Sequence, residues 1–528
     1  MTQFGLVIRY KPLLLQLQFW NTVQDKTQII RMYKYFFLFL SITFVALACQ
    51  KDDNFITDSS AKLEFSLDTL RFDTVFTEVG SATRTLKVFN RNNQPIKISR
   101  ISVENPNTKF RFNVDGVPGN EATEIEIAAN DSLYIFGEVT INPDDPLSLS
   151  PYIVEDNLLF ETNGNDQVVH LEAFGQNANY VPNRFAQNSF ALLSCDFGDE
   201  FWTDTLPYVI YGVLFINECT LHIPEGTEVY VHGGIARQID PVTDESLIYN
   251  SGLIYVDSMG HIEINGTLEN PVTIQGDRLE EPFQDDAGQW VGIYMRSQGN
   301  KINHTTIKNG QFGVRVDPNA SLEIKNSEIY NMSSVGIAGV AASIDAENCL
   351  IYNTGSFCTQ LILGGDYSFD YCTMASYGQD ASALSISNGI CLTLGCGDAL
   401  WDDLDADFRN CIIYGSREDE VALDDFARFD GIEADFNYNL ENCIVRVNKL
   451  IDETEPNPYP DFFDHCSPCT NAEPSEALFL DPNEDDYHLD TLSIAEGQAQ
   501  IINQIFLDLE GNMRDGMTPD IGCFERQN

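Results

Sequence analysis

Basic residues are scarce in this sequence. Its 528 residues include 30 Lys and Arg against 80 Asp and Glu, which gives a formal net charge of −50. Because the few basic residues are scattered, the chain would repel the phosphate backbone of nucleic acids and anionic membrane surfaces. We therefore expect no nucleic-acid partner. Acidic polysaccharides should be repelled too, unless cations bridge the charges.

Apolar residues are not scarce, but they do not form a long run. The chain is 43% hydrophobic and contains 34 Phe and 21 Tyr, a composition that excludes a disordered acidic protein. Near the N-terminus, Tyr35–Ala48 is free of charge over about 14 residues, whereas a membrane-spanning helix needs about 20. A retained transmembrane anchor is therefore the weaker interpretation of this segment.

The same segment has the pattern of an export signal. Arg31 and Lys34 precede it, and the small residues of Ala-Leu-Ala end it before Cys49. A thiol at this place can be alkylated with diacylglycerol, whose acyl chains hold the protein on a membrane. The pattern predicts Met32 as the true start, removal of the residues before Cys49, and lipid attachment at Cys49. An ordinary signal peptide is the alternative.

The region around the cleavage point resembles a bacterial lipobox, although Ala46 stands where Leu is commoner. The residues that follow, Gln50-Lys-Asp-Asp53, resemble the acidic export tag of Bacteroidota lipoproteins. The resemblance implies a protein that is lipid-anchored in the outer membrane and exposed at the cell surface. Residues 49–60 would then be the anchored linker, after a signal region of residues 1–48.

Short segments of alternating apolar and polar residues follow, from about residue 61 to 176. Examples are Leu63–Leu67, Thr85–Phe89, Ile96–Val103 and Val168–Phe174. A period of two residues predicts strands with one buried side. About seven such strands over roughly 115 residues predict an immunoglobulin-like β-sandwich. It is similar to the Ig-like modules that serve mainly as spacers in bacterial surface proteins.

A motif recurs every 22 residues farther along the chain. Its copies are His304-Thr-Thr-Ile-Lys-Asn309, Asn326-Ser-Glu-Ile-Tyr-Asn331, Asn348-Cys-Leu-Ile-Tyr-Asn353 and Asp370-Tyr-Cys-Thr-Met-Ala375, with later copies from Asn410 and Asn442. Apolar positions alternate with period two, which excludes a helical solenoid. A coil of about 22 residues, whose short strands pair with the equivalent strands of the next coil, is the geometry of a parallel β-helix.

Equivalent positions of such coils stack in columns. Ile307, Ile329 and Ile351 are predicted to point inward, and the residue two places earlier in each motif forms a second inward column that includes Ser327, Cys349, Cys411 and Cys443. The first residue of each motif is predicted at a bend, where stacked amides hydrogen-bond along the axis. The longer intervals predict an acidic insertion, residues 376–436, where a binding surface would be built.

Two upstream strings extend the pattern, Gly266-Thr with Pro271-Val and Gly276-Asp, and Trp290-Val-Gly-Ile293. With them, residues 190–455 resemble right-handed parallel β-helix proteins of the pectate-lyase-like superfamily, particularly its uncharacterised lipoproteins. The fold class implied is all-β, a sandwich followed by a β-helix. Residues 456–528 resemble the closing segment of such helices, a cap that protects unpaired strand edges.

No catalytic signature accompanies this resemblance. Hydrolases of the superfamily that act on pectin carry Asn-Thr-Asp, Gly-Asp-Asp and Gly-His-Gly, and none of these strings occurs. Its lyases use a Lys or Arg base together with calcium. Arg315 and Asp317 are the weak catalytic candidates, because the flanking Val314 and Val316 are predicted to point inward. A solvated strand position is the alternative for Arg315.

Candidate metal ligands are few. Asp403, Asp405 and Asp407 have the spacing of an oxygen-rich calcium loop. Phe408 stands where such a loop needs Gly, and Tyr414 where it needs a bidentate Glu, so a solvated acidic insertion is the alternative. No cofactor is required by any pattern in the chain, and calcium is the metal ion that this spacing suggests.

Cysteines suggest local cross-links. Of 13 cysteines, Cys49 is assigned to lipid, and two close pairs lie in predicted loops, Cys391 with Cys396 and Cys466 with Cys469. Each pair is a candidate disulfide, and a zinc site that shares all four thiols is the alternative. The cysteines of the inward column are interpreted as inert core thiols.

Two functions follow from these observations. The first is a non-enzymatic surface lipoprotein that binds glycan or a partner protein through its β-helix. The alternative is a polysaccharide lyase or glycoside hydrolase that acts on extracellular polysaccharide, which rests on resemblance of fold alone. A cleft lined by two outward carboxylates would favour the enzyme, and a flat face with exposed aromatic residues would favour binding.

Overall fold

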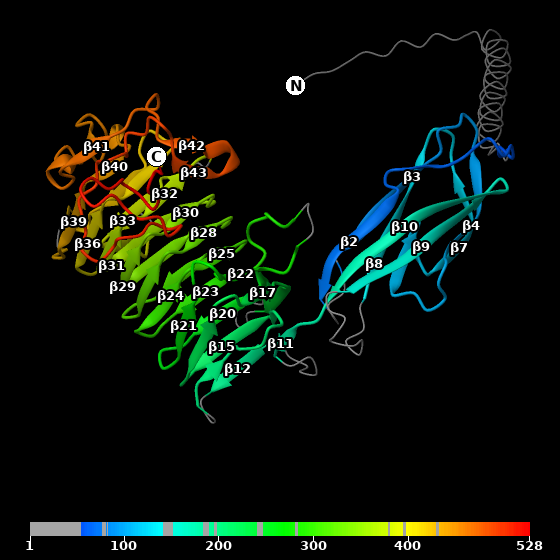
Figure 1. The fold of residues 1–528 in the computed structure, drawn as a ribbon, viewed down its shortest axis with the longest axis horizontal. Helices are drawn as coiled ribbons and strands as arrows, with labels where there is room; N and C mark the ends of the chain where they lie inside the picture. Colours follow the sequence, from blue (N-terminus) through cyan, green and yellow to red (C-terminus); the bar gives the residue numbers. More distant parts are fainter. Residues whose placement is uncertain are drawn as a thin grey trace, which may run out of the picture.

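The computed structural model describes residues 54–76, 81, 83–140, 152–182, 190–194, 198–239, 246–279, 283–378, 381–393, 396, 398–428 and 432–527. These residues form a β-sandwich followed by a right-handed parallel β-helix (Figure 1). The predicted export signal, Cys49 included, lies outside the described residues. Within these ranges no helix is both long and apolar enough to cross a membrane.

Two five-stranded sheets form the sandwich. The first has the order β1 (Glu64–Phe65), β3 (Arg84–Phe89), β8 (Ser132–Val139), β5 (Phe110–Val114) and β6 (Val117–Pro118). The second has the order β2 (Thr69–Phe76), β10 (Asn165–Gln176), β9 (Tyr152–Thr162), β4 (Ile96–Val103) and β7 (Glu121–Ile127). Inward side chains such as Phe72, Phe110 and Phe160 are buried between them. The predicted β-sandwich is confirmed.

Each coil of the β-helix passes through three faces. Face 1 consists of β12 (Phe190–Ser194), β15 (Val213–Asn217), β20 (Leu253–Val256), β23 (Gly292–Met295), β26 (Val314–Val316), the first halves of β29 (Ile337–Glu347) and β31 (Thr359–Asp370), β33 (Leu384–Ser387) and β38 (Val421–Asp424). Face 2 consists of β13 (Glu200–Phe201), β16 (Thr220–Pro224), β21 (His261–Asn265), β24 (Asn300–Asn303), β27 (Ser321–Lys325), the second halves of β29 and β31, β36 (Leu404–Arg409) and β39 (Phe436–Glu441).

Face 3 is a separate sheet of 11 strands. Its order is β11 (Asn179–Val181), β14 (Tyr208–Tyr211), β17 (Glu228–His232), β22 (Val272–Gly276), β25 (Thr305–Lys308), β28 (Glu328–Tyr330), β30 (Leu350–Tyr352), β32 (Thr373–Ser376), β37 (Ile412–Gly415), β40 (Cys443–Val445) and β41 (Cys469–Asn471). Neighbouring strands within each face are parallel, because they belong to successive coils of one β-helix.

The predicted columns are present. Ile307, Ile329 and Ile351 are register partners and are fully buried. The polar residues that begin the motifs have left-handed backbone at the bend, with φ of +47° at Asn326 and +51° at Asn348. There the amide of Asn348 donates a hydrogen bond to Oδ1 of Asn326 over 3.1 Å. The bend is thus stabilised by stacked side-chain amides.

The fourth copy of the motif departs from the predicted spacing. Leu350 pairs with Thr373, so this coil contains 23 residues and Tyr371, with φ of +52°, occupies the bend in place of Asp370. The additional residue lies in β31, where two residues between Ile362 and Gly365 oppose one residue of β29. Such a β-bulge adds a residue without changing which side chains point inward beyond it.

The acidic segment 376–436 is not one insertion, as the longer intervals predicted. Strands β33, β36, β37 and β38 all lie within it and stack on the coils before them. What leaves the helix is an antiparallel hairpin of β34 (Gly389–Cys391) and β35 (Ala399–Trp401). The prediction failed because only the face 3 strand of each coil carries the recognisable motif.

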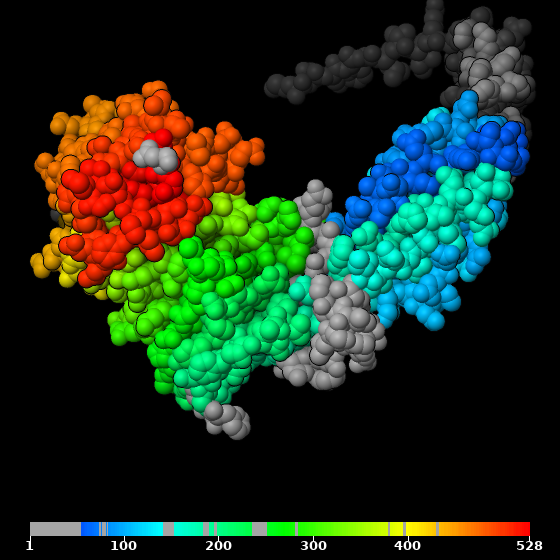
Figure 2. All heavy atoms as spheres, viewed as in Figure 1, coloured from blue at the N-terminus to red at the C-terminus, as the bar shows by residue number. Residues whose placement is uncertain are grey.

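The C-terminal residues do more than close the helix. Tyr459 and Phe462 cover the end of the inner core, where the ring of Phe462 lies 6.1 Å from that of Tyr438. Later residues return along the outer side of face 3, in red in Figure 2. The contacts include those of Leu478, Phe479, Tyr487, Ile521 and Phe524 with Leu350, Tyr352, Ile412, Tyr414 and Ile444.

Arg514 links this returning segment to the bends. Its buried guanidinium donates a hydrogen bond to Oδ1 of Asn348 over 2.8 Å and lies 3.8 Å from the ring centroid of Tyr371. Nη1 of Arg514 also lies 3.6 Å from Oε2 of Glu525, so the buried positive charge is paired with a carboxylate. The segment therefore stabilises the coils from outside as well as at their end.

One buried carboxyl makes the stability of the helix depend on pH. Glu420 is fully buried, accepts hydrogen bonds from the backbone N–H groups of Ala383 and Arg417, and burial raises its pKa to about 7. The native state keeps a proton that the unfolded chain releases near pH 4.5. We expect the stability to fall by roughly 3 kcal/mol between pH 4.5 and 8 through this group.

Thermal unfolding from pH 5 to 8 tests this expectation. The unfolding temperature should fall less steeply with rising pH in Glu420→Gln than in the unmodified protein. Glu433→Gln, an exposed control, should leave this dependence on pH unchanged. An equal slope for Glu420→Gln and the unmodified protein would contradict the assignment.

Candidate functional site

A line of aromatic side chains runs along the outer side of face 1. Phe215, Tyr255 and Tyr294 are register partners on β15, β20 and β23, and Arg315 of β26 follows in the same column. They point outward because their strand neighbours, such as Ile254 and Ile293, are buried inside the helix. We call the outward set Phe190, Phe215, Tyr255, Tyr294, Phe312 and Arg315 the face 1 stripe.

The rings of the stripe form two groups of neighbouring rings, Phe190 with Phe215 and Tyr255, and Tyr294 with Phe312. Phe215 and Tyr255 stack with centroids 5.1 Å apart and planes at 14°. Phe190 lies 5.9 Å from Phe215 at one end, and Phe312 meets Tyr294 edge-on at 6.0 Å at the other. Beyond Arg315 the outward column continues with Ala338, Gln360 and Ser385. The aromatic surface is therefore confined to the first coils.

Charged groups border the stripe at its Arg315 end. Nε of Arg315 donates a hydrogen bond to Oδ1 of Asp317 over 2.8 Å, and Arg296 lies 3.8 Å from the other carboxylate oxygen. Arg296 also donates to the hydroxyl of Tyr255 over 3.2 Å, and this hydrogen bond raises the pKa of Arg296. Burial raises the pKa of Tyr294, so that its phenol keeps its proton. Hydrogen-bond donors and acceptors thus stand beside the rings.

The two candidates named from the sequence, Arg315 and Asp317, are brought together here. Arg315 faces outward between the buried Val314 and Val316. The guanidinium group stays charged in proteins, so an arginine is poorly suited to accept a proton. Its guanidinium also lies 5.4 Å from the ring centroid of Tyr294. The pair is therefore suited to hold hydroxyl or carbonyl oxygens rather than to abstract a proton.

Sequence reasoning missed the aromatic partners of this pair. Tyr255 and Tyr294 lie on adjacent strands but are 39 positions apart, because loops of unequal length separate the early coils. One of these excursions is the hairpin of β18 (Ile235–Ile239) and β19 (Ser246–Asn250) in the preceding coil. The signal that was available is the recurrence of Phe or Tyr between two aliphatic residues.

A second candidate lies where the returning C-terminal segment meets face 3. A groove of about 420 Å³ is lined by Leu268, His304, Thr306 and Glu328 from the coils, and by Glu510 and Asn512 from that segment. Burial raises the pKa of Glu328, the charge of Glu510 raises it further, and His488 opposes both. Within the described ranges the side-chain carboxyl group of Glu328 has no hydrogen bond or ion pair.

Glu510 is held differently from Glu328. Nε2 of His488 lies 3.1 Å from Glu510, and Nδ1 of the same ring lies 2.6 Å from Asp486. Burial lowers the pKa of His488, but these two carboxylates outweigh it and the net pKa is raised. Two carboxyl groups whose surroundings differ in this way provide the arrangement from which an acid and a base are built. The two residues are 182 positions apart, so no sequence motif could reveal them.

The predicted calcium loop is not formed. Asp405 and Asp407 lie on strand β36 and Asp403 just before it, so the three side chains are spread along an extended backbone. Oδ1 of Asp405 and of Asp407 accept hydrogen bonds from Asn437 and Asn439 of the next coil, over 2.9 and 3.3 Å. Among the described residues, no three His, Cys, Asp or Glu side chains gather closely enough to hold a metal ion.

Among the described residues two disulfides lie at separate places. Cys391 is joined to Cys396 in the hairpin that leaves the coils, and Cys466 to Cys469 at the start of β41. The four sulfurs do not form a shared zinc site. The inward column contains the free thiols of Cys349, Cys372, Cys411 and Cys443, all fully buried. Burial raises the pKa of the first three far above the ordinary value, which makes them unreactive.

Comparison with known proteins supports the fold. A family model described as a right handed beta helix region matches residues 291–452. No curated protein matches the chain. Among solved structures, the catalytic domain of a GH87 alpha-1,3-glucanase in complex with nigerose shares 9% identity, with 75% of this chain and 92% of that chain covered and a TM-score of 0.18.

Two further structures are similar over smaller parts. The ASH/PapD-like domain of human CEP192 shares 8% identity over 24% of this chain and 92% of its own, with a TM-score of 0.16. A protein of unknown function from Porphyromonas gingivalis W83 shares 12% identity over 36% of this chain and 66% of its own, also with a TM-score of 0.16. Likenesses this low carry no argument about activity. The chain is a β-sandwich followed by a right-handed parallel β-helix.

Proposed function

We propose that this protein is a cell-surface lipoprotein that binds glycan along the face 1 stripe. The observation that carries the proposal is the column of outward rings on consecutive coils, from Phe215 through Tyr255 to Tyr294. Aromatic rings offer flat apolar surfaces on which the apolar faces of sugar rings pack. Arg296, Arg315 and Asp317 supply the polar groups that orient a ligand. A β-helix also fits a carbohydrate-related function.

A polymer of repeating units suits this surface better than a folded protein. The rings repeat once per coil along the axis, so a chain of sugars would meet an equivalent ring at each step. Arg315 of the stripe and the adjacent Arg296 share Asp317, which neutralises one of their two charges. We therefore propose that the stripe binds an uncharged glycan, because little free charge is available there for an acidic one.

A hydrolase is the second candidate, and the groove at face 3 supports it. Glu328 and Glu510 line the same groove and have different electrostatic surroundings, as glycoside hydrolysis requires of its two carboxyl groups. In such a reaction Glu328 would donate a proton to the leaving oxygen, and Glu510 would act on the opposite side of the sugar.

Attachment to the outer membrane through Cys49 completes the proposal. Three sequence features support export and lipidation. They are the charge-free segment before Cys49, the small residues at its end and the acidic residues after Cys49. The sandwich would then hold the β-helix away from the membrane. An acidic helix is suited to that position, since anionic lipid headgroups repel it.

Substitutions in the stripe should weaken glycan binding. Tyr255→Ala and Tyr294→Ala should each lower the affinity for a neutral polysaccharide roughly three- to tenfold, because each removes a stacking ring. Phe201→Ala, an exposed aromatic residue of face 2, is the matched control and should bind as the unmodified protein does. Calorimetric titration with the glycan selected from a panel gives the affinities. Unchanged affinity in both stripe variants would overturn the proposal.

The same panel separates binding from catalysis. We expect binding without new reducing ends or unsaturated products. Product release that Glu328→Gln abolishes, with binding retained, would establish the groove as a hydrolase site instead. Unsaturated products from the unmodified protein would indicate a lyase.

The lipid anchor has an independent test. Cys49→Ala should move the protein from the membrane fraction to the soluble fraction of the cells that produce it, because no acyl chain can be attached. Fractionation followed by immunoblotting measures the change. Full retention of the variant in membranes would contradict the proposed anchor.

A further inference from the structure

The sandwich has an aromatic surface of its own. On strand β8, Tyr134 and Phe136 point outward and are 47% and 43% exposed, while Leu133 and Ile135 between and beside them are buried. The two rings stack with centroids 6.4 Å apart and planes at 15°. Two large exposed rings side by side on a sheet have no role in the core of the sandwich.

Basic residues flank these rings. Nζ of Lys87, on the neighbouring strand β3, lies 4.9 Å from the ring centroid of Tyr134 and 5.2 Å from that of Phe89. Arg111 of β5 is exposed on the other side of β8. We call the outward set Lys87, Phe89, Arg111, Asn113, Tyr134 and Phe136 the sandwich platform.

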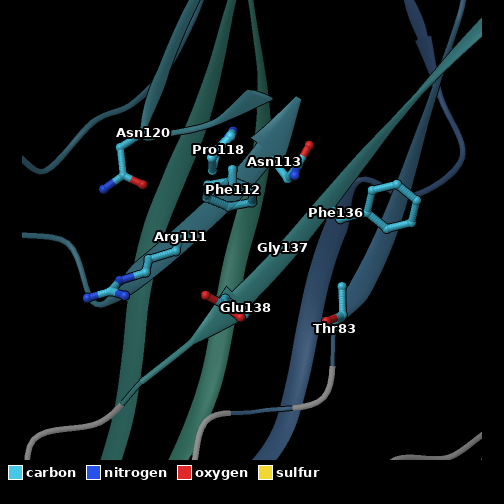
Figure 3. A pocket seen from close by; sticks show the side chains of 10 residues that line it. Thr83, Arg111, Phe112, Asn113, Pro118, Asn120, Phe136, Gly137 and Glu138 are labelled. Atoms are coloured by element: carbon cyan, nitrogen blue, oxygen red, sulfur yellow. The ribbon is translucent and has the colours of Figure 1, made fainter. Parts of the chain in front are cut away.

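A pocket adjoins the platform. Its volume is about 640 Å³, and its wall includes Arg111, Asn113, Asn120, Phe136 and Glu138. Figure 3 shows Phe136 at one side of the pocket and Arg111 at the other, with the guanidinium extending away from Glu138. An apolar ring, a cation and side-chain amides therefore surround one open space.

The charge of this surface differs from that of the chain as a whole. Strands β3, β8 and β5 contain Arg84, Lys87 and Arg111 but only one carboxylate, Glu138. Within the described part of the chain, neither Lys87 nor Arg111 forms an ion pair, even though Arg111 and Glu138 are register partners. Other basic residues of the sandwich are paired, for example Arg91 with Glu64 and Arg100 with Glu121.

We infer that the sandwich platform binds an acidic glycan, one that carries carboxylate or sulfate groups. Tyr134 and Phe136 pack against sugar rings, while Lys87 and Arg111 hold the acid groups. The net charge of −50 does not prevent this, because charges farther than about 8 Å away are screened at physiological ionic strength. The sandwich would thus be a binding module rather than only a spacer.

The charge pattern separates this site from the face 1 stripe. Arg315 of the stripe and the adjacent Arg296 share Asp317, whereas Lys87 and Arg111 have no carboxylate partner in the described ranges. Glycan classes should therefore divide between the two surfaces, acidic chains on the sandwich and neutral chains on the helix. The inference does not depend on the proposed function of the stripe.

Binding of alginate and chondroitin sulfate to the purified protein tests the inference, with dextran as the neutral comparison. Both acidic polymers should bind more tightly than dextran to the platform, and the affinity should fall as salt is raised. Tyr134→Ala, Phe136→Ala, Lys87→Gln and Arg111→Gln should each weaken acidic binding about three- to tenfold. Unfolding temperatures within a few degrees of the unmodified protein verify the fold of each variant.

Two matched controls identify the surface. Arg100→Gln removes a paired basic residue from the other sheet, and Tyr255→Ala removes a ring of the face 1 stripe; both should leave acidic binding unchanged. No binding of either acidic polymer, or binding that the platform variants do not alter, would overturn the inference. Capture of anionic phospholipid vesicles that the same variants abolish, without polysaccharide binding, would assign the platform to a lipid surface and overturn it as well.

Discussion

The in-register stacking of parallel coils is the constraint on which the β-helix depends. Each strand forms its hydrogen bonds with the equivalent strand of the next coil, so that Ile307, Ile329 and Ile351 lie one above another. A shift of one residue would turn every inward side chain outward. Within strand β31 the chain accommodates an additional residue because a bulge absorbs it. The bends, the buried thiols and the Arg514 contacts all follow from that register.

The same register generates the functional surface. Because inward positions must be apolar, every second residue of a strand faces solvent at a fixed spacing. Aromatic residues at these positions on three successive strands therefore form one column. The register also explains why the side chains of Asp403, Asp405 and Asp407 do not come together. An extended strand keeps alternate carboxylates apart. Asn437 and Asn439 of the next coil donate hydrogen bonds to Asp405 and Asp407.

Local pattern was sufficient for the architecture. The period of two residues and the repeat at 22 residues identified the sandwich and the helix, because both signals come from burial of one side of a strand. The prediction was wrong where strands carry no recognisable motif. Strands β33 and β38 carry no face 3 signature, so the segment that contains them was interpreted as an insertion although it forms coils. The return of residues after 472 along face 3 was likewise hidden, since its contacts are remote in sequence.

The sequence by itself determined that the protein is all-β, acidic and built from stacked coils, and it identified Arg315 beside Asp317. Only the tertiary structure decided which residues stand around that pair. Tyr255 and Tyr294 meet through strand pairing across loops of unequal length, and Glu328 meets Glu510 because the C-terminal segment folds back. Tyr134, Phe136 and Lys87 share a surface for the same reason, since adjacent strands bring together residues that no spacing in the chain relates. Periodicity reports which side of a strand is buried, whereas a binding surface depends on which strands become neighbours.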